Sequence, residues 1–189
     1  VAAAAHSLPL FMLFNGVANL FGIGGASLIS RSLGANDRQK ATKAASFSIW
    51  TSAVIAVVYG AVIYALKGVI LPRIGANSDT YFYCTQYVLW TITIGGVPTV
   101  MNILLAHLVR AEGNSKQASF GMALGGVMNI ILDPVFIFAL KMEVAGAAAA
   151  TMLSNLIATV YFILFIRKNR DTSCIFIVMK RQLLRWIFL

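Results

Sequence analysis

The chain has 189 residues, of which 59% are hydrophobic and only 11% are charged. This composition excludes an ordinary soluble domain, which could not hide so much apolar surface in one core, and it predicts a lipid environment. The formal net charge of +9 does not indicate nucleic acid as a partner, because the basic residues lie between apolar runs and not along one face.

Five apolar windows are long enough to cross a bilayer, which takes about 20 residues each. In chain order the predicted spans cover residues 8–30, 44–66, 83–109, 118–140 and 144–166. Continuous hydrophobicity at this length indicates helices, because barrel strands alternate and are about half as long. The sequence therefore predicts an all-α integral membrane protein. Residues 1–166 would form a bundle of about five transmembrane helices, and residues 167–189 a basic cytoplasmic linker or the start of a further span.

Basic residues are divided unevenly between the two sides of these spans. The first and second connections on one side hold four and two of them, the segment after the fifth span holds six, and the opposite side holds three. By the positive-inside rule, the regions near 31–43, 110–117 and 167–189 are cytoplasmic in a multi-pass protein of the plasma membrane. Val1 then lies outside, and the chain does not begin with methionine, so we expect a piece of a longer protein with at least one earlier span.

The connections carry recognisable turn signals. RSLGANDRQKA (31–41) and RAEGNSKQA (110–118) both contain Arg-x-x-Gly, a polar step, then Gln and a basic residue. Glycine can supply the left-handed residue that ends a helix, and Asn36 or Asn114 can begin the next one. The similarity suggests repeated helical hairpins, although generic turn chemistry gives the same pattern. Residues 67–82 are rich in turn formers and predict a loop.

Small residues and proline inside the spans predict helix geometry. Gly95, Gly96 and Pro98 lie in the middle of the third span and predict a bend, which could serve gating or be a static kink. Small residues elsewhere predict close helix packing; they are Gly121, Gly125, Gly126 and residues 146–150.

The fourth span contains a carboxylate within NIILDPVFIF (129–138). Ionisable residues inside spans are costly to bury, so Asp133 indicates a functional site. Asn129 lies one turn earlier on the same face, and Pro134 withholds a hydrogen bond from the carbonyl of Ile130. These oxygens are a partial ligand set for a small hard cation. The alternative is that Asp133 is protonated and only joins helices by hydrogen bonds.

Depth within the membrane gives a second indication. A tight outer turn around residues 141–143 would make the fourth and fifth spans antiparallel. Counted from the predicted outer ends, Asp133 and Thr151 lie at equal depth, as do Asn129 and Asn155. At about 1.5 Å of rise per residue, these form polar layers roughly 10 and 16 Å from the boundary. The pairs face each other only if both helices are rotated correctly, and we predict a cation or proton site around Asp133.

Other chemistry has little support in the sequence. It contains no paired carboxylates, metal-binding histidine motif or Ser–Lys pair, so an enzyme is not expected. GIGGAS (22–27) lacks the spacing of a phosphate loop and lies in an apolar helix, which argues against nucleotide binding. His107 is a lone histidine, of the kind that more often caps or packs. Cys84 and Cys174 fall on opposite predicted sides, so no disulfide or metal framework follows.

Three parts of the sequence resemble the multidrug and toxic compound extrusion (MATE) transporters. They are GGASLISRSLGANDRQKA (24–41), LVRAEGNSKQAS (108–119), and NIILDPVFIF with VAGAAAAT (129–138 and 144–151). Members of that family are similar twelve-helix proteins with two six-helix lobes. The resemblance implies that this chain holds spans two to six of the amino-terminal lobe and the beginning of the interlobe linker, without the first span and the carboxy-terminal lobe.

The resemblance also implies a function and a site. The family's cation site matches Asn129, Asp133 and Thr151, and the depth count adds Asn155; a further aspartate on the family's first span has no counterpart here. The chain would be part of a secondary active antiporter that exports organic cations or drugs in exchange for Na⁺ or H⁺, with no other cofactor. Its partners would be the lipid bilayer and a small amphiphilic or cationic substrate. Alternatives are a lipid-linked oligosaccharide flippase of the same superfamily, which should have a strongly cationic cavity, and a non-transporting membrane scaffold.

Overall fold

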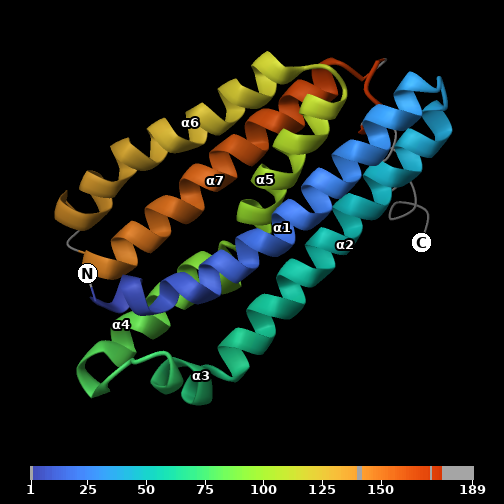
Figure 1. The fold of residues 1–189 in the computed structure, drawn as a ribbon. Coiled ribbons are helices and arrows are strands. Elements are labelled where there is room, and N and C mark those ends of the chain that lie inside the picture. The colour runs from blue at the N-terminus through green and yellow to red at the C-terminus, as the bar shows by residue number, and fades with distance from the viewer. Residues whose placement is uncertain (1, 140–141, 171, 176–189) are drawn as a thin grey trace, which may run out of the picture.

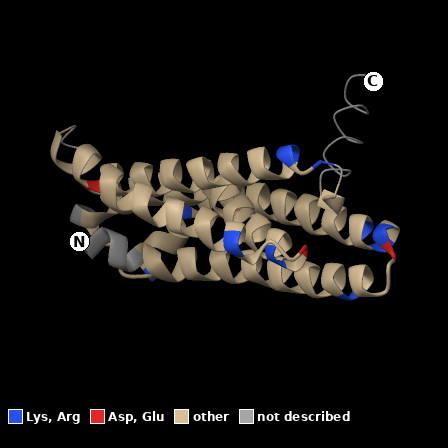
Figure 2. Cartoon of the chain, turned by 90° about the horizontal axis from the view of Figure 1, so that it is seen from above, with Lys and Arg blue, Asp and Glu red and all other residues tan. Residues whose placement is uncertain are grey.

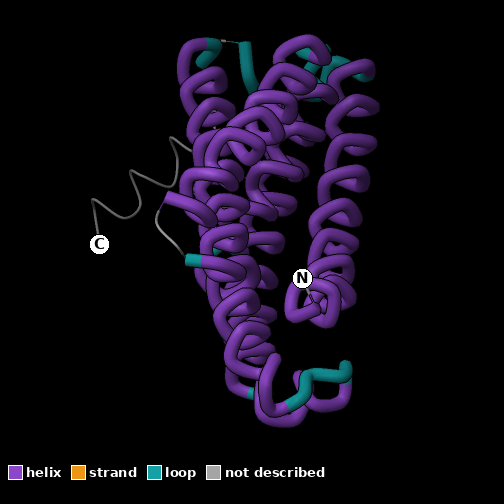
Figure 3. Tube along the Cα trace, turned by 90° about the vertical axis from the view of Figure 1, so that its left-hand side faces the viewer, coloured by secondary structure: helices purple, strands orange, loops and turns teal. Residues whose placement is uncertain are grey.

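The computed structural model describes residues 2–139, 142–170 and 172–175, and these residues form helices and short connections without a strand (Figure 3). The all-α bundle predicted from hydrophobicity is confirmed. The elements in chain order are α1 (Ala2–Gly34), α2 (Arg38–Ala65), α3 (Lys67–Arg73), α4 (Ser78–Val88), the π-helix η1 (Leu89–Ile94), α5 (Gly96–Ala111), α6 (Ser115–Pro134), the π-helix η2 (Val135–Ala139) and α7 (Glu143–Lys168).

By length and composition, four described helical segments can cross a membrane, and a bent pair of helices adds a fifth. Each overlaps one predicted span, so the predicted number of spans is confirmed. Large apolar side chains cover the outside of the bundle; Ile130 is 72% exposed and Phe138 is 75% exposed. An apolar surface of this extent is stable against lipid and not against water. The chain is a multi-pass membrane protein.

The third span is a bent pair made of α4, η1 and α5. Its two halves meet at 50° around Gly95, which confirms the predicted bend. A Cβ atom on Gly95 would collide with the carbonyl oxygen of Trp90 and with the side chain of Met152 on α7. Pro98 lies in the first turn of α5, where a missing N–H costs no helical hydrogen bond. Glycine therefore lets α7 approach the bend closely, and proline is compatible with the restart of the helix.

The loop predicted for residues 67–82 is partly wrong, because α3 and the beginning of α4 occupy most of it. Leu71 of α3 is fully buried in a cluster with Cys84 and Val88 of α4. Pro72 is tolerated near the end of so short a helix, where few backbone bonds depend on its N–H. Burial of Leu71 thus favours a helix in a segment whose turn-forming residues had predicted a loop.

The two similar turns use different residues for the left-handed position. In the α1–α2 turn, Asn36 has φ 58° while Gly34 remains helical, and Asp37 caps α2. The prediction that glycine ends α1 is therefore wrong, since asparagine also tolerates this conformation. In the α5–α6 turn, Gly113 has φ 88° as predicted, and Asn114 stands at the N-cap of α6.

The helices form two pairs joined by α5. The pair α1 and α2 and the pair α6 and α7 both pack against α5 (Figure 1). Gly121 and Gly125 of α6 face side chains of α7, and Gly146 of α7 lies against the backbone of η2, so close packing is confirmed at these positions. The prediction of close packing is wrong for Gly126, where an added Cβ would have no neighbour within 4 Å.

The α1–α2 turn, the α5–α6 turn and the carboxyl end of α7 lie at the same end of the bundle (Figure 1). The Ser30 hydroxyl donates a hydrogen bond to the carbonyl of Ala111 at 3.4 Å, and Ser173 donates to the Glu112 carboxylate at 2.9 Å. Most of the described lysine and arginine residues belong to the connections and helix ends on this side (Figure 2). The connections at the basic end therefore contact one another and lie on one side of the spans, where the charge count placed them.

Candidate cation site between α6 and α7

The fourth span changes its helical form directly after the predicted carboxylate. α6 ends at Pro134 and continues as the π-helix η2. Pro134 has no N–H to donate to the carbonyl of Ile130, so the α-helical ladder is interrupted at this point. The wider turns of η2 follow the interruption, and such π segments are frequent at functional sites. The residues just before the proline therefore lie where the backbone is least regular.

Three predicted site residues come together there. The Asn129 amide nitrogen donates to Asp133 Oδ1 at 3.3 Å and to Thr151 Oγ1 at 3.4 Å. The Thr151 hydroxyl in turn donates to the carbonyl of Ala147 at 2.9 Å. All three side chains are half-buried. Asn129 is thus the centre of the group, because it contacts the carboxylate on its own helix and the hydroxyl on α7.

Asn155 belongs to a neighbouring polar group that faces α5. Its amide nitrogen donates to the Thr151 carbonyl at 3.0 Å and to Thr99 Oγ1 at 3.2 Å, while its oxygen accepts from Asn102 at 2.8 Å. Asn155 does not pair with Asn129 as equal depth suggested, because a helix turns by about 100° per residue and depth alone does not fix direction. Sequence reasoning missed Thr99 and Asn102, although an amide inside the apolar third span was a usable signal.

Among the described residues, Asp133 makes no hydrogen bond to another helix. Within the described residues its hydrogen bond comes from Asn129 on the same helix, and no lysine or arginine forms an ion pair with it. The link between α6 and α7 runs through Asn129 and Thr151 instead. A purely adhesive role for the carboxylate therefore has little basis in its contacts.

The histidine and the cysteines considered in the sequence analysis do not form a second site in the described residues. A ring nitrogen of His107 lies 3.1 Å from the Asn19 side-chain oxygen and joins α5 to α1. No disulfide joins the two buried cysteines, Cys84 and Cys174. Within the described part of the chain, no three histidine, cysteine or acidic residues gather as a metal cluster would. The oxygen-rich group around Asn129 is thus the candidate site, and its carboxylate, amide and hydroxyl suit a hard cation or a proton.

Comparison with known proteins gives a consistent result. The sequence model of the MatE family matches residues 1–135. The chain is 34% identical over 173 residues to the multidrug export protein MepA of Staphylococcus haemolyticus (strain JCSC1435). This alignment covers 91% of the chain and 38% of that protein. The chain is 33% identical over 171 residues to MepA of Staphylococcus aureus (strain NCTC 8325 / PS 47), with 90% and 38% covered. The chain thus spans about 38% of the length of these curated relatives.

Solved structures agree with the sequence relatives. A MATE transporter in the bent conformation superposes with a TM-score of 0.86 at 29% identity, over 92% of this chain and 38% of that one. An outward-facing multidrug resistance MATE transporter gives 0.83 at 29% identity, over 91% and 40%. An inward-facing one gives 0.77 at 29% identity, over 87% and 37%. The described bundle therefore has the helix arrangement of one part of these larger transporters.

Proposed function

This chain belongs to the MatE family, and from that premise we propose that it is part of a secondary active antiporter in the plasma membrane. The antiporter exports organic cations or drugs in exchange for Na⁺ or H⁺. Because the chain spans only about 38% of the curated relatives' length, the transport belongs to the full-length protein. The contribution of these helices is the coupling-ion site formed by Asn129, Asp133 and Thr151.

The observation that supports this site most directly is the central position of the Asn129 amide. Its nitrogen donates to one oxygen of Asp133 and one of Thr151. A half-turn of the amide about its last side-chain bond exchanges this nitrogen for the amide oxygen. The Asn129 oxygen would then stand about 3.3 and 3.4 Å from the other two oxygens. Ligand oxygens about 2.4 Å from a hard cation, at right angles to one another, have nearly this separation.

The amide therefore gives the site two forms. With its nitrogen inward, Asn129 holds Asp133 and Thr151 together in the absence of a cation. With its oxygen inward, it supplies a third ligand oxygen beside the carboxylate and the hydroxyl. A proton on Asp133 replaces the cation in the alternative mode of coupling, since it removes the same negative charge from the span. Either ion changes which groups join α6 to α7.

The irregular backbone next to the site couples this change to the lobe. Pro134 and η2 interrupt the hydrogen-bond ladder of α6, so α6 can change its bend there with little loss of backbone bonding. A change in the α6–α7 link at Asn129 then alters the direction of η2. Each elementary charge that crosses the membrane potential is worth about 2.3 kcal/mol per 100 mV. One coupled cation can thus sustain a concentration ratio of roughly tens-fold for the exported compound.

The test replaces Asp133→Asn in the full-length protein and measures efflux of a fluorescent organic cation from cells or vesicles under an imposed Na⁺ or pH gradient. We expect loss of gradient-driven efflux at a normal level of folded protein. Glu143→Gln is the matched control, because it removes an exposed carboxylate at the beginning of α7 and should leave efflux unchanged. Unchanged efflux in Asp133→Asn would remove the proposed coupling role and favour a scaffold or another transport mechanism.

A further inference from the structure

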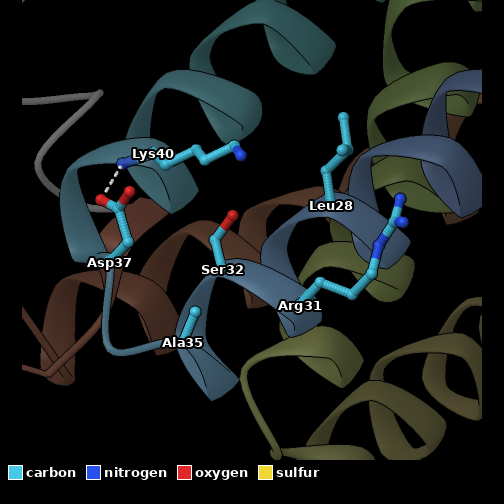
Figure 4. Close-up of a pocket in the computed structure, with 6 residues that line it drawn as sticks. All are labelled: Leu28, Arg31, Ser32, Ala35, Asp37 and Lys40. Atoms are coloured by element: carbon cyan, nitrogen blue, oxygen red, sulfur yellow. Dashed lines mark hydrogen bonds between the residues drawn. The ribbon is translucent and has the colours of Figure 1, made fainter.

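A pocket opens between the end of α1 and the beginning of α2, away from the cation site (Figure 4). Its volume is about 230 Å³, which is room for several water molecules at about 30 Å³ each. The pocket lies at the basic end of the bundle. Its lining residues are Leu28, Arg31, Ser32, Ala35, Asp37 and Lys40.

The charges of this pocket favour an anion. Lys40 and Arg31 are exposed cations, and neither has a carboxylate partner within the described residues. Asp37 is the acidic residue of the lining, and its carboxylate accepts a hydrogen bond from the backbone N–H of Lys40 at 2.9 Å as the cap of α2. Two cations and one carboxylate leave a formal charge of +1 on the lining. The Lys40 ammonium and the Asp37 carboxylate point in different directions (Figure 4).

The hydroxyl of a serine also points into the same space. Ser32 is only 4% exposed, and its side chain extends into the pocket toward the Lys40 ammonium (Figure 4). This hydroxyl makes no hydrogen bond in the part of the chain that the structure describes. A hydroxyl that lines a pocket and has no bond within the protein is free to donate to a bound group. An acceptor oxygen placed between Ser32 and Lys40 would satisfy the hydroxyl and meet the ammonium at once.

We propose that this pocket binds a phosphate group, carried either by the headgroup of an anionic membrane lipid or by a soluble phosphate. Phosphate oxygens accept charge-assisted hydrogen bonds from lysine and arginine and an ordinary one from serine. The pocket stands at the basic end of the spans, where anionic headgroups attract cationic side chains. Leu28, which is 44% exposed on the rim, offers an apolar contact for the rest of a lipid molecule.

Lipid binding is tested on the full-length protein purified in detergent, with native mass spectrometry after addition of phosphatidylglycerol or phosphatidylcholine. We expect the protein to retain phosphatidylglycerol in preference to phosphatidylcholine. Ser32→Ala and Lys40→Gln should each reduce that retention by about fivefold to tenfold, as the loss of one such hydrogen bond predicts. Lys43→Gln removes an exposed charge from the same helix outside the pocket lining and should change retention less than twofold.

A second experiment measures binding of inorganic phosphate and distinguishes a lipid headgroup from a soluble phosphate as the ligand. Binding of inorganic phosphate, sensitive to Ser32→Ala, without preferential retention of phosphatidylglycerol would uphold the site and assign it to a soluble phosphate. The proposal is overturned if neither probe binds, if Ser32→Ala has no effect on either probe, or if Lys43→Gln weakens binding as much as Lys40→Gln. Lys40 is exposed, so its variant keeps the test valid even if Ser32→Ala disturbs folding.

Discussion

At the scale of single residues, Thr151 on α7 supplies the hydroxyl oxygen that accepts a hydrogen bond from Asn129 on α6. Its hydroxyl accepts from Asn129 and donates to the Ala147 carbonyl. Thr151→Val retains a branched side chain but removes both bonds. We expect the Na⁺ or H⁺ concentration that half-saturates efflux to rise about tenfold, since a hydrogen-bonding group at a charged site is worth roughly 1.5–3 kcal/mol. The measurement is dye efflux from vesicles against cation concentration.

Thr159→Val provides the control for this substitution. Thr159 lies on the same helix, and its hydroxyl donates to the carbonyl of Pro98 at 3.0 Å. The variant therefore removes a buried interhelical bond without touching the proposed site, and the half-saturating concentration should stay at the wild-type value. An equal rise in both variants would mean that hydroxyl loss acts through general helix packing and not through ion binding.

Cys174 is held as a neutral thiol beside a carboxylate. Burial, the hydrogen bond to Glu112 and the negative charge of that carboxylate together raise the pKa of Cys174 to about 12. The thiolate is the reactive form, so alkylation by iodoacetamide at pH 8 should be very slow and should accelerate as pH rises toward 12. Glu112→Gln removes the negative charge, lowers the pKa and should accelerate alkylation at pH 8 by about tenfold or more.

The rate is measured by mass spectrometry on full-length protein in which Cys84→Ala leaves Cys174 as the thiol of this segment. Glu143 lies at the other end of α7 and is not hydrogen-bonded to Cys174, so Glu143→Gln should leave the alkylation rate unchanged. Rapid alkylation of the wild-type thiol at pH 8, or an equal rate in Glu112→Gln, would show that the carboxylate does not hold the thiol neutral.

At the scale of elements, the same carboxylate fixes the segment after α7 to the α5–α6 turn. Glu112 accepts hydrogen bonds from the Ser173 hydroxyl and from the backbone N–H groups of Cys174 and Ile175, at 2.8 to 3.2 Å. This is how an acidic side chain satisfies the first N–H groups of a helical turn. Gly113, with its positive φ, turns the chain directly after Glu112. The RAEG sequence thus both ends α5 and anchors a segment some sixty residues later.

The contact between η2 and α7 depends on a glycine. A Cβ atom on Gly146 would lie 2.8 Å from the carbonyl oxygen of Phe136, which belongs to the backbone and cannot rotate away. We expect Gly146→Ala to destabilise the protein by about 1–3 kcal/mol, as overpacking does. Gly126→Ala is the matched control, since its Cβ would meet nothing within 4 Å, and it should be neutral or stabilising by up to about 1 kcal/mol.

Thermal unfolding of both variants in detergent gives the comparison. The melting temperature should fall for Gly146→Ala and stay or rise for Gly126→Ala. Equal shifts would mean that the close approach of η2 to α7 contributes nothing to stability. A fall for Gly126→Ala alone would mean that lipid or another part of the full-length protein covers that face.

The features that could be predicted from the sequence were those that depend on residues close together along the chain. Hydrophobic length fixed the five spans, and Gly95 with its neighbours indicated the bend. The pairing of Asn129 with Asp133 followed from helical spacing alone. What failed needed three-dimensional information: α3 is helical because Leu71 is buried against α4, and Asn155 turned toward Thr99 because rotation, which depth does not supply, decides its neighbours.

At the scale of the whole molecule, the basic turns and the proposed cation site lie toward opposite ends of the bundle. The described part of the chain places its basic turns at one end of the bundle (Figure 2), while Asp133 stands near the opposite end of α6, next to η2. A cation drawn inward by the membrane potential would reach the carboxylate from the less basic side. The basic turns then lie where anionic headgroups are densest. This ordering requires a cytoplasmic basic end, which the charge count predicts.

The orientation has a direct test with single cysteines in the full-length protein after Cys84→Ala and Cys174→Ala. Asn114→Cys places a thiol in the basic α5–α6 turn, and Asn77→Cys places one in the exposed turn before α4 at the opposite end. On intact cells, a membrane-impermeant maleimide should label the cysteine at position 77 and not the one at 114. Permeabilised cells should show both, which controls for reactivity. Labelling of position 114 from outside would reverse the orientation and place the phosphate pocket outside the cell.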